Sequence, residues 1–172
     1  MVFMAGHGLN DVNGRFFFLP HDANLNRLIS TAISSDDIRD ALGTLAGKSF
    51  LFIDSCHSGN AFGTARLRST STDSAAFINE LTSAENGVVV FSASTGRQVS
   101  LEDKKWGNGA FTKALVEGIS GGADFTKTAK ITHKGLDFYI AERVKELTNG
   151  LQTPVSISPE GMPDFPIALA IN

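Results

Sequence analysis

Four short apolar runs constrain the fold of this chain more than any other feature of its sequence. None of them alternates apolar with polar residues, which is typical of strands that are covered on both faces of a sheet. The runs are Val2 to Ala5, Ser49 to Ile53, Gly87 to Ser92 and Pro166 to Ile171. We therefore expect these segments to be strands and to lie largely inside the molecule.

Segments with apolar residues at helical spacing lie between these runs. They cover residues 38–45, 77–81, 111–119 and 136–147. Ser34 or Ser35 is expected to cap the first helix, and His133, at the start of the last, is expected to be exposed. Alternating strands and helices predict an α/β fold, a three-layer α/β/α sandwich with a mostly parallel sheet.

Three other segments complete the predicted organisation. Phe16 to Leu19 follows the Asn13-Gly14 turn signal, which favours a short surface hairpin. Residues 60–74 are rich in Ser, Thr, Gly and Arg, and residues 152–166 contain four prolines. Both stretches are interpreted as exposed loops.

Length and composition limit the function classes. The 172 residues predict one domain over residues 1–172, and a net charge of −3 without a basic block argues against nucleic-acid binding. No apolar run approaches the ~18 residues of a membrane span. The one cysteine excludes an internal disulfide and a Cys-rich zinc site, so we expect a reducing, cytoplasmic location. Because the chain begins within a strand-like run, we expect it to be the downstream part of a longer protein.

Two polar breaks follow the first two strands and carry the candidate chemistry. His7 lies in the first break, between Gly6 and Gly8, and Cys56 lies in the second, which runs from Asp54 to Gly59. In open α/β sheets the carboxyl ends of the strands hold the catalytic groups. An imidazole beside a thiol promotes the nucleophilic thiolate, and the N–H groups of Gly8 and Cys56 are suited to an oxyanion. The alternative is a buried structural cysteine and a histidine in a turn.

The two breaks resemble the caspase–metacaspase superfamily of cysteine peptidases, in which the histidine precedes the cysteine by about 50 residues. Here the separation is 49 residues, and the motif Asp54-Ser55-Cys56-His57-Ser58-Gly59 is similar to that of metacaspases and bacterial caspase-like proteins. The resemblance continues along nearly the whole chain. Further segments that resemble the family are 91–94, Gln98, Glu102, Gly109-Ala110-Phe111-Thr112 and Gln152-Thr153-Pro154.

The resemblance implies a Cys56 nucleophile, His7 as general acid/base, and an oxyanion hole formed by the Gly8 and Cys56 N–H groups. It also implies that Asp54 selects Arg or Lys in a protein or peptide substrate, since a carboxylate matches a guanidinium. The alternative for Asp54 is that it caps N–H groups of its own loop. Ser92, Ser94 and Glu102 are further candidates for the specificity pocket, and for Glu102 a solvated loop carboxylate is equally plausible.

Two departures from the family pattern affect this prediction. Ala5 stands where many metacaspases have serine, two residues before the histidine. The family's earlier strand–helix–strand unit, which carries another pocket acid, is missing, so the first strand is expected to have an unpaired edge or a new neighbour. An upstream segment or sensor domain is therefore expected as a partner. The alternative function is a catalytically inactive caspase-like binding or scaffold module.

Two further features belong to this resemblance. Asp36 and Asp37 resemble an acid pair that holds calcium in many metacaspases, but acids at a helix start are the simpler interpretation. Gly63 stands where another ligand is expected, so we predict no metal site and no cofactor. Self-cleavage after Arg66 or Arg68 is a further hypothesis, and the alternative is that these arginines only solvate the loop.

Overall fold

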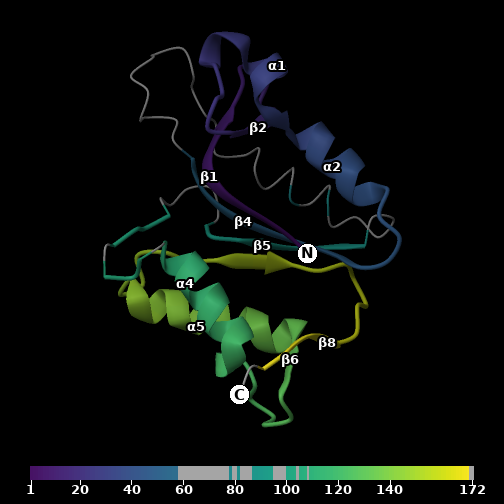
Figure 1. The fold of residues 1–172 in the computed structure, drawn as a ribbon, viewed down its shortest axis with the longest axis vertical. Coiled ribbons are helices and arrows are strands. Elements are labelled where there is room, and N and C mark those ends of the chain that lie inside the picture. The colour runs from purple at the N-terminus through teal and green to yellow at the C-terminus, as the bar shows by residue number, and fades with distance from the viewer. Residues whose placement is uncertain are drawn as a thin grey trace.

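The computed structural model describes residues 1–57, 78, 81, 87–94, 100–103, 105–107 and 109–170, and for Cys56 and His57 it describes the backbone alone. In this part of the chain the main sheet contains six strands in the order β3-β2-β1-β4-β5-β7. Their bounds are β1 Val2–Asn10, β2 Phe16–Leu19, β3 Ile33–Ser34, β4 Ser49–His57, β5 Val88–Ser92 and β7 Val155–Ile157. The predicted α/β class is confirmed by this sheet and by the helices beside it (Figure 1).

The centre of the sheet is parallel, and its outer strands are antiparallel. β4 runs parallel to both β1 and β5, as expected for neighbouring strands joined by crossovers. β2, β3 and β7 each pair antiparallel with their inner neighbour, so the sheet as a whole is mixed. The pairing of β2 with β1 begins at His7, and for Val2 to Gly6 the described residues show pairing with β4 alone.

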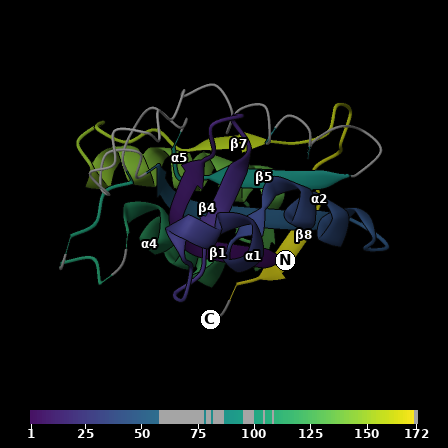
Figure 2. The same ribbon diagram turned by 90° about the horizontal axis from the view of Figure 1, so that it is seen from above.

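Helices cover both faces of the sheet (Figures 1 and 2). α2 (Ser35–Gly43) packs on one face, where Ile38 and Leu42 join a core formed with β4 and β5. α4 (Ala110–Glu117) and α5 (His133–Leu147) pack on the other face and bury the larger cluster. Further helical segments in the described part of the chain include the 3₁₀ turn Leu25–Arg27, α1 (Leu28–Thr31) and the π-helix Gly118–Gly122. None of the helices in the described part of the chain has the length and apolar run that a bilayer crossing requires.

The start of α2 follows from its local sequence. The Ser34 hydroxyl accepts a hydrogen bond from the Asp37 N–H, and the Asp37 carboxylate accepts one from the Ser34 N–H in return. This reciprocal pair forms a capping box, which satisfies two backbone donors that a helix start leaves open. The predicted cap at Ser34 is confirmed. It could be predicted from the sequence because all the groups involved lie within four residues of one another.

The last two strands differ from the prediction. The run at 166–171 was expected to be a covered strand, but β8 (Pro166–Leu169) pairs with β6 (Lys130–Thr132) in a separate two-stranded sheet and is partly exposed. Residues 152–166 were expected to be an exposed loop, yet they contain β7, the outer strand next to β5. β8 was misplaced because an apolar run indicates burial but does not identify the strand with which it pairs. β7 was missed because a three-residue edge strand tolerates the prolines around it.

Two predictions of exposure were also wrong. His133 is 1% exposed, because the rings of Phe50 and Phe165 lie against its imidazole. Phe16 and Phe17 form the predicted hairpin with β1, but they are buried rather than at the surface. β3 pairs with the other edge of β2, so this hairpin is part of the sheet instead of an appendage.

Candidate active site

The central parallel pair of strands makes His7 and Cys56 neighbours. In the register of β1 and β4, His7 pairs with Cys56, and Gly8 pairs with His57. Paired positions on adjacent strands share a face of the sheet and lie about 4.8 Å apart across it. His7 is exposed, so this position of β1 is accessible from solvent. The structure therefore brings together the two positions that the sequence predicted as a dyad.

Both strands extend further than their apolar runs. β1 continues to Asn10 and β4 to His57, so His7 and Cys56 lie within strands instead of in the breaks that follow them. Gly6, directly before His7, has a φ of 154°, which L-residues with a side chain rarely adopt. The local path of β1 at the histidine therefore depends on glycine.

Gly8 is required for a packing reason that its sequence context did not reveal. A Cβ built on Gly8 would lie 2.5 Å from Cε2 of Phe16, whose ring is buried between β1 and α2. Glycine at this position lets the β2 phenylalanine pack directly onto the β1 backbone. The predicted use of the Gly8 and Cys56 N–H groups for an oxyanion stays a prediction.

Asp54 is held by neutral hydrogen-bond donors. The residue is 9% exposed, and the Ser100 hydroxyl donates to its Oδ1 at 2.6 Å. The Thr112 hydroxyl and the Thr112 main-chain N–H both donate to its Oδ2. Thr112 lies in the first turn of α4, whose N-cap Gly109 has no side chain, so Asp54 caps this helix from the neighbouring strand.

No cation of the described residues forms an ion pair with Asp54. A buried carboxylate normally has a charged partner, because removal from water penalises the ionised form. A carboxylate can accept about four hydrogen bonds, and Asp54 receives three from Ser100 and Thr112. Ser100 and Thr112 thus leave about one acceptor position of the carboxylate unfilled.

The other predicted pocket residues lie on segments that border Asp54. Ser92 ends β5 and pairs with Ile53, the residue before Asp54, and its hydroxyl donates to the carbonyl of Ser94 at 3.0 Å. Ser94 is buried. Glu102 is exposed and forms a β-bridge with Gly109. It lies two residues after Ser100, whose hydroxyl donates to Asp54. Their predicted contact with substrate stays a prediction.

Three residues at this site were missed as functional candidates. The sequence gives no sign of a role for Ser100, and it places Thr112 and Gln152 only within segments that resemble the family. Gln152 is 1% exposed, and its side chain bonds the main chain at Ala93 and Leu101. The sequence signal was a polar side chain within an otherwise apolar context, and such a signal does not identify a partner 46 or more residues away.

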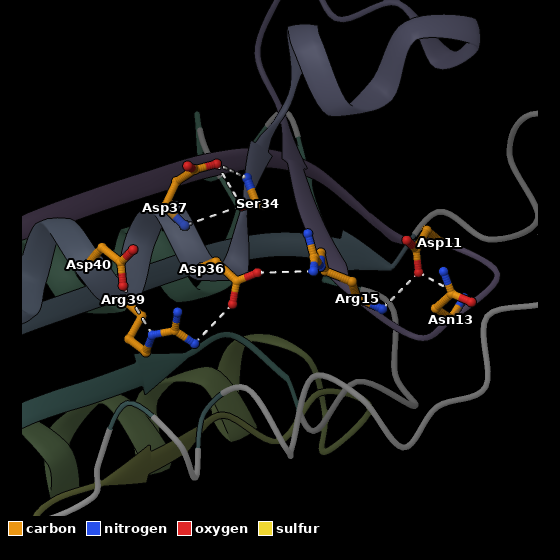
Figure 3. Close-up of polar contacts among 8 residues, drawn as sticks. All are labelled: Asp11, Asn13, Arg15, Ser34, Asp36, Asp37, Arg39 and Asp40. Carbon is orange, nitrogen blue, oxygen red and sulfur yellow. Dashed lines mark hydrogen bonds and ion pairs between the residues drawn. The ribbon is translucent and has the colours of Figure 1, made fainter.

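The acid pair of the calcium hypothesis already has protein partners (Figure 3). Asp36 forms ion pairs with Arg15 at 3.3 Å and with Arg39 at 2.9 Å. Asp37 is the capping acid, and the hydrogen bond from the Ser34 side chain holds the pKa of its carboxyl below the usual value. Within the described ranges, no group of three His, Cys, Asp or Glu residues has a geometry that could hold a metal. Both acids take part in contacts at the start of α2, and the expectation that they hold no calcium stays a prediction.

Comparison with known proteins places this arrangement in a family. The family model for the caspase domain, Peptidase C14, matches residues 1–158. The chain belongs to the caspase domain family. Caspase domains are cysteine peptidases, which agrees with a histidine and a cysteine paired on adjacent parallel strands. No curated protein is similar enough in sequence to count as a match.

Solved structures also resemble this caspase domain. One is the crystal structure of protein GSU0716 from Geobacter sulfurreducens, with a TM-score of 0.60 and 19% sequence identity. The match covers 98% of this chain and 72% of that protein. At this identity the likeness concerns the fold alone. The self-cleavage candidates Arg66 and Arg68 lie outside the described residues, and that hypothesis stays a prediction.

Proposed function

We propose that this caspase domain is a cysteine endopeptidase that cuts protein or peptide substrates after Arg or Lys. The pairing of His7 with Cys56 across β1 and β4 supports the peptidase chemistry. The buried Asp54, with no cationic partner among the described residues, carries the proposal for a basic substrate residue. A guanidinium or ammonium would supply the positive charge that this carboxylate lacks.

The proposed reaction proceeds through an acyl-enzyme. The Cys56 thiolate forms a bond to the scissile carbonyl carbon, and the Gly8 and Cys56 N–H groups receive the negative charge that develops on the oxygen. Breakage of the C–N bond releases the amine, to which protonated His7 gives a proton. Neutral His7 then takes a proton from water, which attacks the thioester, releases the new carboxylate and restores the thiolate.

The surroundings of Asp54 support its role in specificity. Ser100 and Thr112 fix the carboxylate from two sides, so a basic side chain would meet an acid that is already oriented. Ser92, Ser94 and Glu102 border the same position and are proposed to line the pocket. A free nucleophilic thiol suits a reducing compartment, so we also propose a cytoplasmic location.

Hydrolysis of fluorogenic peptides that end in Arg, Lys, Asp or Leu would test this function. The wild type is compared with Cys56→Ala, His7→Ala and Asp54→Asn, each with calcium and with a chelator. We expect turnover after Arg and Lys that is lost in both dyad variants and is insensitive to the chelator. In Asp54→Asn, turnover after Arg should fall at least about 100-fold, since a charge-assisted contact is removed.

Each other outcome contradicts a defined part of the proposal. Turnover after Asp or Leu in preference to Arg would keep the peptidase and reject the role of Asp54. Loss of activity in chelator would reject the metal-independent mechanism. No turnover, with no labelling of Cys56 by a thiol-reactive peptide ending in Arg, would favour the alternative of a caspase-like binding or scaffold module.

Self-cleavage would follow from the same specificity. A peptidase that prefers basic residues would be expected to cut after Arg66 or Arg68, and mass spectrometry of the purified chain would show the two fragments. The Cys56→Ala variant should remain intact under the same conditions. An intact wild-type chain with full activity on peptides would contradict this hypothesis.

A further inference from the structure

The buried amide of Gln152 joins three separate parts of the chain. Its Oε1 accepts a hydrogen bond from the Leu101 N–H at 2.8 Å, and its Nε2 donates to the carbonyl of Ala93 at 2.9 Å. Its own main-chain N–H donates to the hydroxyl of Thr148, just past the end of α5. Donor and acceptor of the amide are therefore both used inside the protein, away from water.

Leu101 is the middle residue of a short strip, residues 100–102, that lies against Asp54. The Ser100 hydroxyl bonds the Asp54 carboxylate, and the carbonyl of Leu101 accepts from the N–H of Ala110 at the start of α4. Glu102 pairs with Gly109. These contacts tie the strip to Asp54 and to α4, and the bond to Gln152 holds it from another direction.

Ala93, the other partner of the Gln152 amide, bonds the main chain of β4. Its N–H donates to the carbonyl of Ile53 at 2.9 Å, directly before Asp54 in β4. Ala93 also lies between Ser92 and Ser94, the two serines expected to line the pocket. One amide side chain thus spans from the end of β5 to the strip. The strip bonds the Asp54 carboxylate through Ser100, and the end of β5 bonds the main chain of the residue before Asp54.

We propose that Gln152 is a positioning residue for substrate specificity, which rests on the function proposed above. It holds the strip 100–102 and the end of β5 at a fixed separation, so that Ser100 keeps the Asp54 carboxylate in the orientation that receives a basic side chain. Without the amide, the Leu101 N–H and the Ala93 carbonyl lose their partner in a buried setting and must shift to find others. Gln152 itself touches no reacting atom.

Gln152→Met tests this role, because it keeps an unbranched side chain of similar size and removes both hydrogen bonds. Gln152→Glu is the second variant, which retains an acceptor for Leu101 and loses the donor to Ala93. Thr148→Val is the matched control. It removes a buried hydrogen bond to the Gln152 main chain and destabilises the same turn, but leaves the amide side chain intact.

Each variant is assayed per active site, after titration of Cys56 with a thiol-reactive peptide. The readouts are kcat and KM for peptides ending in Arg and in Leu, and the pH profile of alkylation of Cys56 by iodoacetamide. We expect the Arg-over-Leu ratio of kcat/KM to fall about tenfold or more in both Gln152 variants, mainly through KM. The alkylation profile should match the wild type, since the dyad is not altered, and Thr148→Val should keep the wild-type ratio.

Two results would overturn the assignment while leaving the proposed function in place. One is a wild-type Arg-over-Leu ratio in Gln152→Glu or Gln152→Met. The other is an equal loss of the ratio in Thr148→Val, which would mean that any destabilisation of this turn has the same effect. A wild type that cleaves after neither Arg nor Lys would instead overturn the proposed function, and the role of Gln152 with it.

Discussion

Thr112 binds the carboxylate of Asp54 with both its main-chain N–H and its hydroxyl. Asp54, which lies in β4 and is predicted to recognise the substrate, therefore also caps α4. The two uses are compatible, because Ser100 and Thr112 donate three hydrogen bonds and a carboxylate can accept about four. The proposed specificity and the placement of α4 would thus depend on the same side chain.

Gly109→Ala tests how closely the carboxylate is fitted to its place. A Cβ on Gly109 would lie 2.9 Å from Oδ2 of Asp54, so the acid or the start of α4 must move. We expect kcat/KM for Arg peptides to fall roughly tenfold to a hundredfold, as is typical of a small misplacement in a binding site. Steady-state kinetics on folded variant would measure it, and an unchanged kcat/KM would show that Asp54 tolerates displacement.

Gly8→Ala should destabilise the protein. The added methyl group would meet the buried ring of Phe16 at 2.5 Å, and overpacking of this kind costs about 1–3 kcal/mol. Urea unfolding followed by circular dichroism would give the free energy of unfolding. The double variant Gly8→Ala with Phe16→Leu controls for the clash, since a smaller side chain at position 16 should recover part of the loss. A single variant as stable as the wild type would refute this packing account.

Glu117 should make stability depend on acid pH. It bonds Arg143 at 2.7 Å and Lys113 at 2.9 Å, and the hydrogen bond from Arg143 lowers the pKa of Glu117 to about 2. Because the folded state lowers this pKa, the stabilisation is complete above about pH 4.5 and is lost as the pH falls toward 2. Its size is about 1 kcal/mol, since the pair is partly exposed to solvent.

Urea unfolding of Glu117→Gln from pH 7 to pH 2 would check this expectation. The difference in free energy of unfolding between the wild type and Glu117→Gln should be largest near neutral pH and approach zero near pH 2. Glu142→Gln makes the same change of charge on the exposed face of α5 and serves as the control. A difference that stays constant over the whole range would exclude Glu117 as its source.

His133 should make the stability of the protein depend on pH in a second range, nearer to neutral than the range set by Glu117. Its imidazole is buried against Phe50 and Phe165, and burial lowers its pKa from 6.5 although Asp164 lies 3.0 Å from Nδ1. Neither ring nitrogen is hydrogen-bonded, so the attraction of Asp164 does not offset the loss of hydration. The folded protein therefore keeps His133 neutral where the unfolded chain is protonated.

The direction in which stability changes with pH follows from this difference in bound protons between the folded and unfolded states. Stability is complete above about pH 6.5 and decreases as the pH falls toward the lowered pKa of the folded state, by at most about 1.4 kcal/mol per pH unit. His133→Gln cannot titrate, so the slope of its free energy of unfolding between pH 7 and pH 5 should be smaller than that of the wild type. Equal slopes would assign the pH dependence to other groups.

Local features of the fold were predictable because their partners are close in sequence. The cap formed by Ser34 and Asp37 spans four residues, and the helix that begins at His133 follows from apolar residues at helical spacing. The pairing of His7 with Cys56 was also predictable in outline, because each residue follows an apolar run and the two runs form adjacent parallel strands. That the two residues act as a dyad stays a prediction. In each of these cases a short stretch of sequence contains the physical cause.

The features that failed to follow from the sequence depend on contacts between distant segments. His133 is buried only because Phe50 and Phe165 reach it from other elements, and β8 pairs with β6 instead of joining the main sheet. Pairing partners and burial are decided when the whole chain packs, and a single segment carries no record of them.

The sequence by itself determined the strand and helix alternation, the family resemblance and the two residues of the proposed dyad. Only the tertiary structure decided how Asp54 is held, since its donors Ser100 and Thr112 lie 46 and 58 residues further along the chain. The same is true of Gln152, whose amide bonds residues 51 and 59 positions away. The physical reason is that a buried polar group must find partners wherever packing brings them, independent of their distance in sequence.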